Sequence, residues 1–213
     1  MTNKYYLMLG KILANGAEQE NKKGAIRYLT NECMPLFPAD LLDIFETYGV
    51  ARNKLKKELH LFEKGVRETA QYREAGIDWW DYCGSTLVNS YPTYLEKYPR
   101  LVERINKEKR NSKNYVMFVG ETNAESNQAP CLSLVQFQIV EGLLMMTAYY
   151  RSSDANLGLP ADIYHLYLMS RQIEAPLHSI TLFFGNVHIY ANNIEKTRLL
   201  LQSGEKTSFN LNV

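Results

Sequence analysis

Apolar positions in the first half of the chain recur at the spacing of amphipathic helices. Residues 4–16 follow this pattern and end at a glycine, which commonly stops a helix. The same spacing returns over residues 41–61 and 94–108, and a shorter helix is predicted to end near Gly76. Residues 21–24, Asn-Lys-Lys-Gly, have the composition of a loop.

The second half of the chain is dominated by runs that are typical of β-strands. Residues 115–119 predict a buried strand. Residues 132–140 and 143–150 predict a hairpin, because the Glu-Gly pair between them is a turn signal. The helical period returns over residues 160–173, where the proline falls in the first turn and is tolerated. The last predicted elements are a strand and a helix, at residues 179–190 and 192–202.

Together these elements predict an α+β fold in which helices pack on one mixed sheet. The chain has 213 residues, of which 46% are hydrophobic, and this allows one sizeable core. We therefore expect a single domain over residues 1–213.

Composition and charge argue against several classes of partner. The net charge of +1 gives no global field that would favour nucleic acid or a membrane surface. Basic residues between positions 97 and 113 are interleaved with glutamates and predict a solvated helix face. The three cysteines lack the spacing of a metal site or a disulfide framework, so no metal is expected. No apolar run is long enough to span a bilayer, and the N-terminus has no signal pattern, so we expect a cytoplasmic protein.

Residues 151–163 carry the strongest chemical signal. Arg151, Ser152 and Asp154 precede a Gly-Leu-Pro turn that begins at Gly158 and opens an apolar helix. A guanidinium and a hydroxyl at such a junction suit an anion such as a phosphate. A surface ion pair is the alternative for this arginine taken singly.

Cys131 is the candidate nucleophile. The predicted hairpin brings Cys131 close to Arg151, whose charge can favour the reactive thiolate. Most single cysteines are structural, and that alternative stays open.

Other polar side chains can reach the same place. Lys22 and Lys23 could contact the phosphate, although a solvated lysine pair is an equal alternative. His188 and Tyr190 alternate on one strand and therefore point to the same side, where both can enter a cleft. Half-buried sheet residues are the alternative for these two.

In order and spacing, these motifs resemble the thymidylate synthase family. Residues 149–163 are similar to the family segment that binds nucleotide phosphate, and residues 185–195 to the segment whose histidine and tyrosine hold the sugar hydroxyl. The resemblance runs over residues 4–203 and implies a thymidylate synthase-like fold and a homodimer. It also implies a pyrimidine nucleoside monophosphate as substrate and 5,10-methylenetetrahydrofolate as cofactor.

The resemblance also assigns roles in the first half of the chain. Glu58, in a Glu-Leu-x-x-Phe motif, is similar to the glutamate that organises proton transfer, and Tyr91 resembles the active-site tyrosine. Trp80 resembles a tryptophan near the folate site, and Asp154 and Gly158 are implied to help seat the folate.

Several positions depart from the synthase pattern. Leu132 replaces the histidine that follows the nucleophilic cysteine. Lys113, followed by Asn114, stands where synthases donate an Arg-Arg pair to the phosphate across the dimer, and Lys22 stands in place of a loop arginine. The chain also stops soon after the last predicted helix, without the long C-terminal region that closes over folate. We expect this to favour water over hydride as the final nucleophile.

Asp162 is the departure with the clearest chemical meaning. The synthases carry asparagine here, whose amide reads uracil in both directions. Cytosine presents an amino donor and an unprotonated N3, and a protonated carboxyl group can accept from the first and donate to the second. A mismatched buried polar pair costs about 1–3 kcal/mol, which corresponds to about tenfold or more in base preference. Hydroxymethylases that act on CMP or dCMP resemble synthases with aspartate at this position. A helix-start carboxylate stabilised by the helix dipole is the alternative.

We therefore expect folate-dependent hydroxymethylation at C5 of CMP or dCMP. In this scheme Cys131 adds to C6, C5 takes up the one-carbon unit, and water completes the hydroxymethyl group. Glu58 orders a proton-transferring water, and Tyr91 and Asp162 complete the catalytic set. Methylation of a uridylate such as dUMP and a catalytically inactive nucleotide-binding homologue are the two alternatives.

Overall fold

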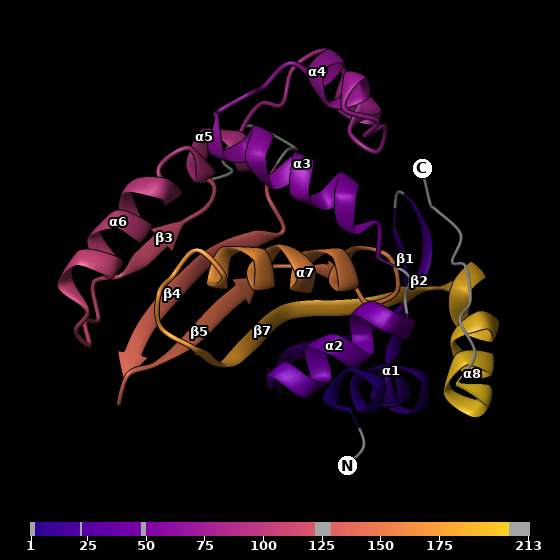
Figure 1. Cartoon of the computed structure of the whole chain (residues 1–213). Coiled ribbons are helices and arrows are strands. Elements are labelled where there is room, and N and C mark those ends of the chain that lie inside the picture. The colour runs from indigo at the N-terminus through magenta and orange to yellow at the C-terminus, as the bar shows by residue number, and fades with distance from the viewer. Residues whose placement is uncertain (1–2, 22, 48–49, 122–128, 205–213) are drawn as a thin grey trace.

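The computed structural model describes residues 3–21, 23–47, 50–121 and 129–204. Its strands form one mixed sheet and are β1 (Ala17–Asn21), β2 (Gly24–Leu36), β3 (Val116–Phe118), β4 (Leu132–Val140), β5 (Leu143–Tyr150), β6 (Ser153–Asp154) and β7 (Leu177–Tyr190). Their order across the sheet is β1-β2-β7-β5-β4-β3, with β6 paired to β7 (Figure 1). Neighbouring strands are antiparallel, except that β5 and β6 run parallel to β7.

Helices cover this sheet. The α-helices are α1 (Lys4–Asn15), α2 (Pro38–Thr47), α3 (Arg52–Glu63), α4 (Thr69–Glu74), α5 (Tyr91–Leu95), α6 (Tyr98–Glu108), α7 (Gly158–Ser170) and α8 (Ile194–Ser203). Two short 3-10 helices are Asp81–Cys83 and Ala191–Asn193. Helix α7 lies along the sheet with α3 beyond it, so it is packed between two layers (Figure 1). That position explains why apolar side chains surround α7 instead of forming a single stripe.

The two faces of the sheet differ in burial. Along β4 and β5 every second side chain is buried against the helices, as a period of two requires. On the opposite face, Leu134 pairs with Tyr149, and Tyr149 pairs with Phe183 of β7. This row of apolar side chains is only partly covered, and Tyr149 and Phe183 are exposed.

The structure confirms the α+β class and the predicted hairpin. Strands β4 and β5 have the predicted bounds and pair antiparallel. Glu141 and Gly142 both adopt positive φ, which suits the tight turn of a hairpin. Strand β7 and helices α1, α7 and α8 lie within a few residues of their predicted positions. None of the helices in the described ranges is long and apolar enough to cross a membrane.

Two predicted helices are each divided in the structure. The predicted helix over residues 41–61 consists of α2, which ends at Thr47, and α3, which begins at Arg52. The predicted helix over residues 94–108 begins with α5 and continues as α6, which has a proline in its first turn. A proline is tolerated there but cannot continue a preceding helix, because it lacks the N–H donor and its ring clashes with the preceding turn.

The first two strands were missed by the prediction. Within the predicted loop at residues 21–24, Asn21 ends β1 and pairs with Gly24, which begins β2. Strand β2 is long, yet only three of its side chains are buried, so it lacks the alternation that indicates a strand. Asn31 has a φ of 56° and interrupts the strand in its middle. Pairing with β7 over its length stabilises β2 despite this irregular pattern.

Candidate active site

A cavity of about 1240 Å³ lies where the end of β5, the start of α7 and helix α3 meet. Nearly all of the predicted site residues line it: Glu58, Trp80, Tyr91, Cys131, Arg151, Ser152, Asp154, Gly158, Asp162, His188 and Tyr190. Lys22 lies outside the described residues, but its neighbour Lys23 lines the cavity. Lys113 lies elsewhere, in the turn between α6 and β3.

The hairpin brings Cys131 and Arg151 together as predicted. The Arg151 backbone N–H donates to the Cys131 carbonyl over 2.9 Å. The Arg151 guanidinium also holds the two residues before Cys131. Its Nε donates to the Pro130 carbonyl at 3.0 Å, and its Nη2 donates to the Ala129 carbonyl at 2.7 Å. Arg151 is exposed, and a guanidinium has five N–H donors, so it retains donors for an anion.

The predicted effect of Arg151 on the Cys131 thiol is present in the free protein but is outweighed. Burial and the charge of Asp162 raise the pKa of Cys131 to about 11. Arg151 and Lys23 act in the opposite direction, but they do not outweigh the loss of hydration. Cys131 therefore carries its proton at neutral pH until a ligand changes its surroundings.

Two aspartates flank the start of α7. Burial raises the pKa of Asp154 to about 6, against hydrogen bonds from the backbone N–H groups of Asn156 and Leu157. These bonds give Asp154 a structural role in the turn that leads into the helix. A Cβ added to Gly158 would lie 3.9 Å from Asp162 Oδ2, which places the Asp162 carboxyl over the first turn.

Asp162 combines the features of an acid. Burial, together with the charges of Glu58 and Asp154, raises its pKa to about 7, although His165 lowers it. At neutral pH the protonated and ionised forms are therefore both populated. Asp162 lies in the same cavity as Cys131, and its charge raises the pKa of Cys131.

Glu58 is the centre of a buried polar cluster. Its Oε1 accepts from the indole N–H of both Trp79 and Trp80, each at 2.5 Å. Its Oε2 lies 3.1 Å from Nε2 of His165. Trp79 and His165 were not singled out in the sequence, because their contacts with α3 come from residues far apart in the chain. The one available signal for His165 was its position three residues after Asp162, on the same helix face.

Tyr91 connects this cluster to the nucleophile. Its hydroxyl accepts from the Leu132 backbone N–H at 3.3 Å, next to Cys131. Its ring stacks on Phe62 with the centroids 5.4 Å apart. Burial raises the pKa of Tyr91 well above its usual value, so the hydroxyl stays protonated and is available as a donor.

His188 and Tyr190 point into the cavity from β7, as the strand alternation predicted. Nδ1 of His188 lies 3.0 Å from Asn186 Oδ1, and an amide oxygen there requires the hydrogen on Nδ1. Burial lowers the pKa of His188 to about 4, so the ring is neutral at neutral pH. Its Nε2 is then an acceptor that suits a hydroxyl donor.

Two groups of side chains with opposite charge line the cavity. The first, the cationic end, consists of Lys23, Arg151 and Ser152, and the Lys23 ammonium lies 4.8 Å from the centroid of the Tyr82 ring. The second, the acidic end, consists of Glu58, Asp154 and Asp162. This combination suits a ligand that has both an anionic group and a polar ring.

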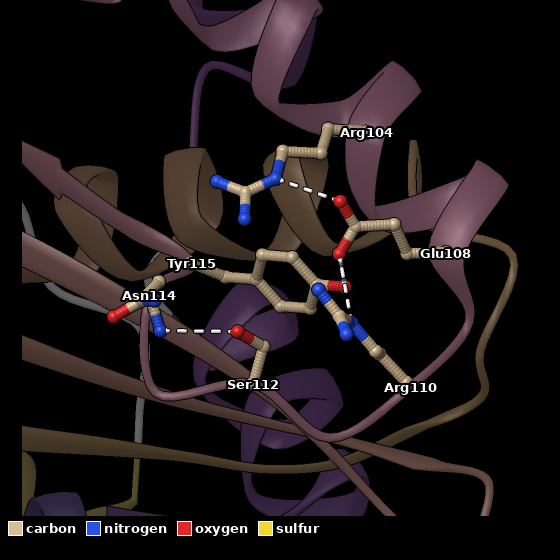
Figure 2. A network of polar contacts seen from close by, with 6 residues as sticks. All are labelled: Arg104, Glu108, Arg110, Ser112, Asn114 and Tyr115. Carbon is tan, nitrogen blue, oxygen red and sulfur yellow. Dashed lines mark hydrogen bonds and ion pairs between the residues drawn. The ribbon is translucent and has the colours of Figure 1, made fainter.

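Lys113 is held in place by its backbone. Gln136 Nε2 donates to the Lys113 carbonyl at 3.1 Å, and Figure 2 shows the network that orders the rest of this turn. There Glu108 accepts from Arg104, Arg110 and Tyr115. Hydrogen bonds, first from Tyr115 and then from Arg104, lower the pKa of Glu108 to about 2. The turn is ordered without any contact with the cavity of its own chain.

A family model described as thymidylate synthase matches residues 3–213 of this chain. The cavity residues and their spacing agree with that match, since the cysteine, arginine, histidine and tyrosine motifs meet at one site. The chain therefore belongs to the thymidylate synthase family.

Proposed function

We propose that this protein hydroxymethylates C5 of a cytidine monophosphate, with Cys131 as the nucleophile. Membership of the family makes it a folate-dependent one-carbon transferase that acts on a pyrimidine nucleotide. The choice of cytosine is supported by one observation above all. Asp162, which stands where synthases carry asparagine, shares the cavity with Cys131 and has a pKa of about 7.

The ionisable carboxyl of Asp162 accounts for the choice of base. In its neutral form it donates its hydrogen to N3 of cytosine and accepts from the 4-amino group, and after proton transfer the carboxylate accepts from both N3–H and the 4-amino group. With uracil only the neutral form can both donate to O4 and accept from N3–H, and the ionised form leaves O4 without a donor. An unsatisfied buried polar group costs about 1–3 kcal/mol, enough for about tenfold to hundredfold discrimination.

The same proton assists the nucleophile. Donation from Asp162 to N3 brings positive charge onto the ring beside Cys131, which favours the thiolate. The Cys131 sulfur then forms a bond to C6, and C5 becomes nucleophilic. Glu58 orders a water that moves protons at C5, and Tyr91 orients the segment that carries the sulfur.

The remaining cavity residues position the nucleotide. Arg151, Ser152 and Lys23 bind the phosphate at the cationic end. His188 accepts from a sugar hydroxyl through Nε2, and Tyr190 contacts the same side of the sugar. These assignments place the base over Cys131 and next to Asp162.

The residues along the cavity fit a folate. Trp80 and Tyr82 form a stacked pair with centroids 6.3 Å apart, which offers an aromatic wall to a flat ring. Asn156 is buried beside this space, and its Oδ1 has no hydrogen-bond partner among the described residues. Asp154, Asn156 and Gly158 would hold the polar edge of the pterin. When bound, 5,10-methylenetetrahydrofolate supplies the one-carbon unit at the oxidation level of formaldehyde.

We further infer that residues 1–213 act as one catalytic domain in a homodimer. The partly exposed row of Leu134, Tyr149 and Phe183 is an apolar surface that a second copy can cover. Lys113 contacts no part of the cavity in its own chain and is therefore available to the phosphate in a partner subunit.

One observation favours an alternative. The high pKa of Cys131 is the property expected of a homologue that binds nucleotide without reacting. The four pyrimidine monophosphates CMP, dCMP, UMP and dUMP, each with methylenetetrahydrofolate, separate the possibilities. We expect a hydroxymethylated cytidylate by mass spectrometry. A methylated uridylate would establish the synthase reaction, and binding without any product would establish the inactive homologue.

A further inference from the structure

His165 contacts two oxygens at the buried side of the site. It lies on α7, and its side chain is 17% exposed. Its Nε2 is 3.1 Å from Glu58 Oε2 and 3.1 Å from the Leu55 carbonyl oxygen. The ring also packs against Phe62, with the centroids 5.9 Å apart. The histidine is therefore fixed between α3 and the cavity.

These contacts determine where the hydrogens are. A backbone carbonyl only accepts, so Nε2 must carry a hydrogen to bond to Leu55. Glu58 Oε2 therefore faces an N–H group. Glu58 Oε1 faces the N–H groups of Trp79 and Trp80, and an indole only donates. Both oxygens of Glu58 act as acceptors, and this is the pattern of an ionised carboxylate.

The carboxylate needs a cation. Glu58 is 2% exposed, and a buried charge without a partner is strongly destabilising. Within the described ranges, Glu58 forms its ion pair with His165. Burial opposes a charge on His165, but the hydrogen bond and charge of Glu58, with the charge of Asp162, leave its pKa raised above 6.5.

We propose that His165 is a positioning residue whose imidazolium keeps Glu58 ionised and thereby leaves Asp162 as the acid of the site. The proposal rests on the function proposed above, for which Glu58 moves protons and Asp162 donates one. His165 touches neither the phosphate nor the reacting carbons, so its effect passes through the two carboxyl groups.

The groups that face this pair come from several elements. Glu58 on α3 and Asp162 on α7 face His165. The titratable groups whose charges act on Asp162 or respond to it are Glu58, His165, Asp154, Tyr91, Cys131 and Tyr150. Of these, His165 alone is a cation when protonated. Without it, the buried Glu58 carboxylate has no cation among these groups and takes up a proton, so it can no longer accept one during the reaction.

The charge state of His165 can be measured without any substrate. We would record the imidazole nitrogen NMR signals of the protein across pH and assign His165 with H165Q. We expect a cationic His165 at pH 7, and a neutral one at the same pH in E58Q, because burial then outweighs the remaining effects of Asp162 and Leu55. His188, whose pKa is lowered by burial alone, serves as the internal reference for a neutral histidine. A neutral His165 at pH 6, or one that E58Q leaves unchanged, would overturn the proposal.

Release of tritium from C5 of the cytidylate then tests the effect on the reaction. H165Q keeps an N–H donor toward Glu58 but removes the charge, and H165A removes both. We expect kcat to fall about tenfold in H165Q and about a hundredfold in H165A, with KM nearly unchanged. The acidic limb of the pH profile should move to higher pH in both variants, because a buried carboxylate without a cation keeps its proton to higher pH. H60Q, at an exposed position on α3, is the matched control.

The outcomes separate this inference from the proposed function. If the wild-type protein reacts and H165Q has the wild-type kcat and pH profile, the role of His165 is wrong and the function stands. If the wild-type protein releases no tritium from any pyrimidine monophosphate, the proposed function fails. The NMR titration then still decides whether His165 and Glu58 form a charged pair.

Discussion

The cationic end and the acidic end of the cavity carry opposite charges in opposite surroundings. Arg151 and Lys23 are exposed, so their charges are hydrated. Glu58 is almost fully buried, and burial raises the pKa of Asp154 to about 6 and that of Asp162 to about 7. The comparison teaches that, in the proposed function, binding and proton chemistry use different side chains. The exposed side chains attract the nucleotide, and the buried ones select the base.

Charges from both groups act on Cys131, and its removal should have the largest effect. Cys131→Ser should lower the rate of tritium release from C5 of the cytidylate by at least about 10³-fold, because no covalent adduct can form at C6. Nucleotide binding should be retained, since Arg151 and Asp162 are untouched. Cys33→Ser, at an exposed position on β2, should behave as wild type. Unchanged activity in Cys131→Ser would rule out the covalent mechanism.

Arg151→Gln tests the cationic end alone. The loss of a charged hydrogen bond to phosphate costs about 1.5–3 kcal/mol, so KM for the cytidylate should rise about tenfold to hundredfold. The base preference should stay the same, because the acidic end is intact. Arg198→Gln, on the exposed surface of α8, is the control for loss of one positive charge. A changed ratio of cytidylate to uridylate activity in Arg151→Gln would contradict the separation of the two ends.

The reactivity of the Cys131 thiol sharpens the comparison, because both ends act on its pKa. Above pH 7 Asp162 is mostly ionised and raises the thiol pKa, so Asp162→Asn should speed alkylation by iodoacetamide at pH 8.5 by about three- to tenfold. Arg151→Gln should slow it, because the guanidinium favours the thiolate. Mass spectrometry of the peptide that contains Cys131 separates this reaction from those of the other cysteines. Equal rates in all three proteins would show that neither charge reaches the sulfur.

The close approach of β7 to Arg151 predicts the smallest effect. A Cβ on Gly185 would lie 2.9 Å from the Arg151 carbonyl oxygen and 3.0 Å from the Tyr149 hydroxyl. Gly185→Ala should lower the free energy of unfolding by about 1–3 kcal/mol, as measured in urea. Gly10→Ala, in α1 and with open space at its Cβ, should be neutral or gain up to about 1 kcal/mol. A Gly185→Ala variant with the wild-type free energy of unfolding would show that β7 can move away from Arg151.

The sequence predicted the parts of the site that depend on local geometry. Cys131 and Arg151 meet because a hairpin has a fixed register, and His188 and Tyr190 share a side because strands alternate. The sequence did not reveal Trp79 or His165 as partners of Glu58, since α3 and α7 meet only through tertiary packing. The raised pKa of the Cys131 thiol was not predicted for a related reason. The opposing effect of Arg151 follows from the hairpin, whereas the burial of Cys131 depends on the whole fold.

The central claim is that the acid at position 162 selects cytosine for attack by Cys131. The most direct test compares tritium release from C5 of a cytidylate and a uridylate by the wild-type protein and Asp162→Asn. We predict that the wild type prefers the cytidylate by about tenfold or more, and that Asp162→Asn reverses or abolishes this preference. A wild-type protein that releases tritium faster from the uridylate, or a variant with the wild-type preference, would contradict the account.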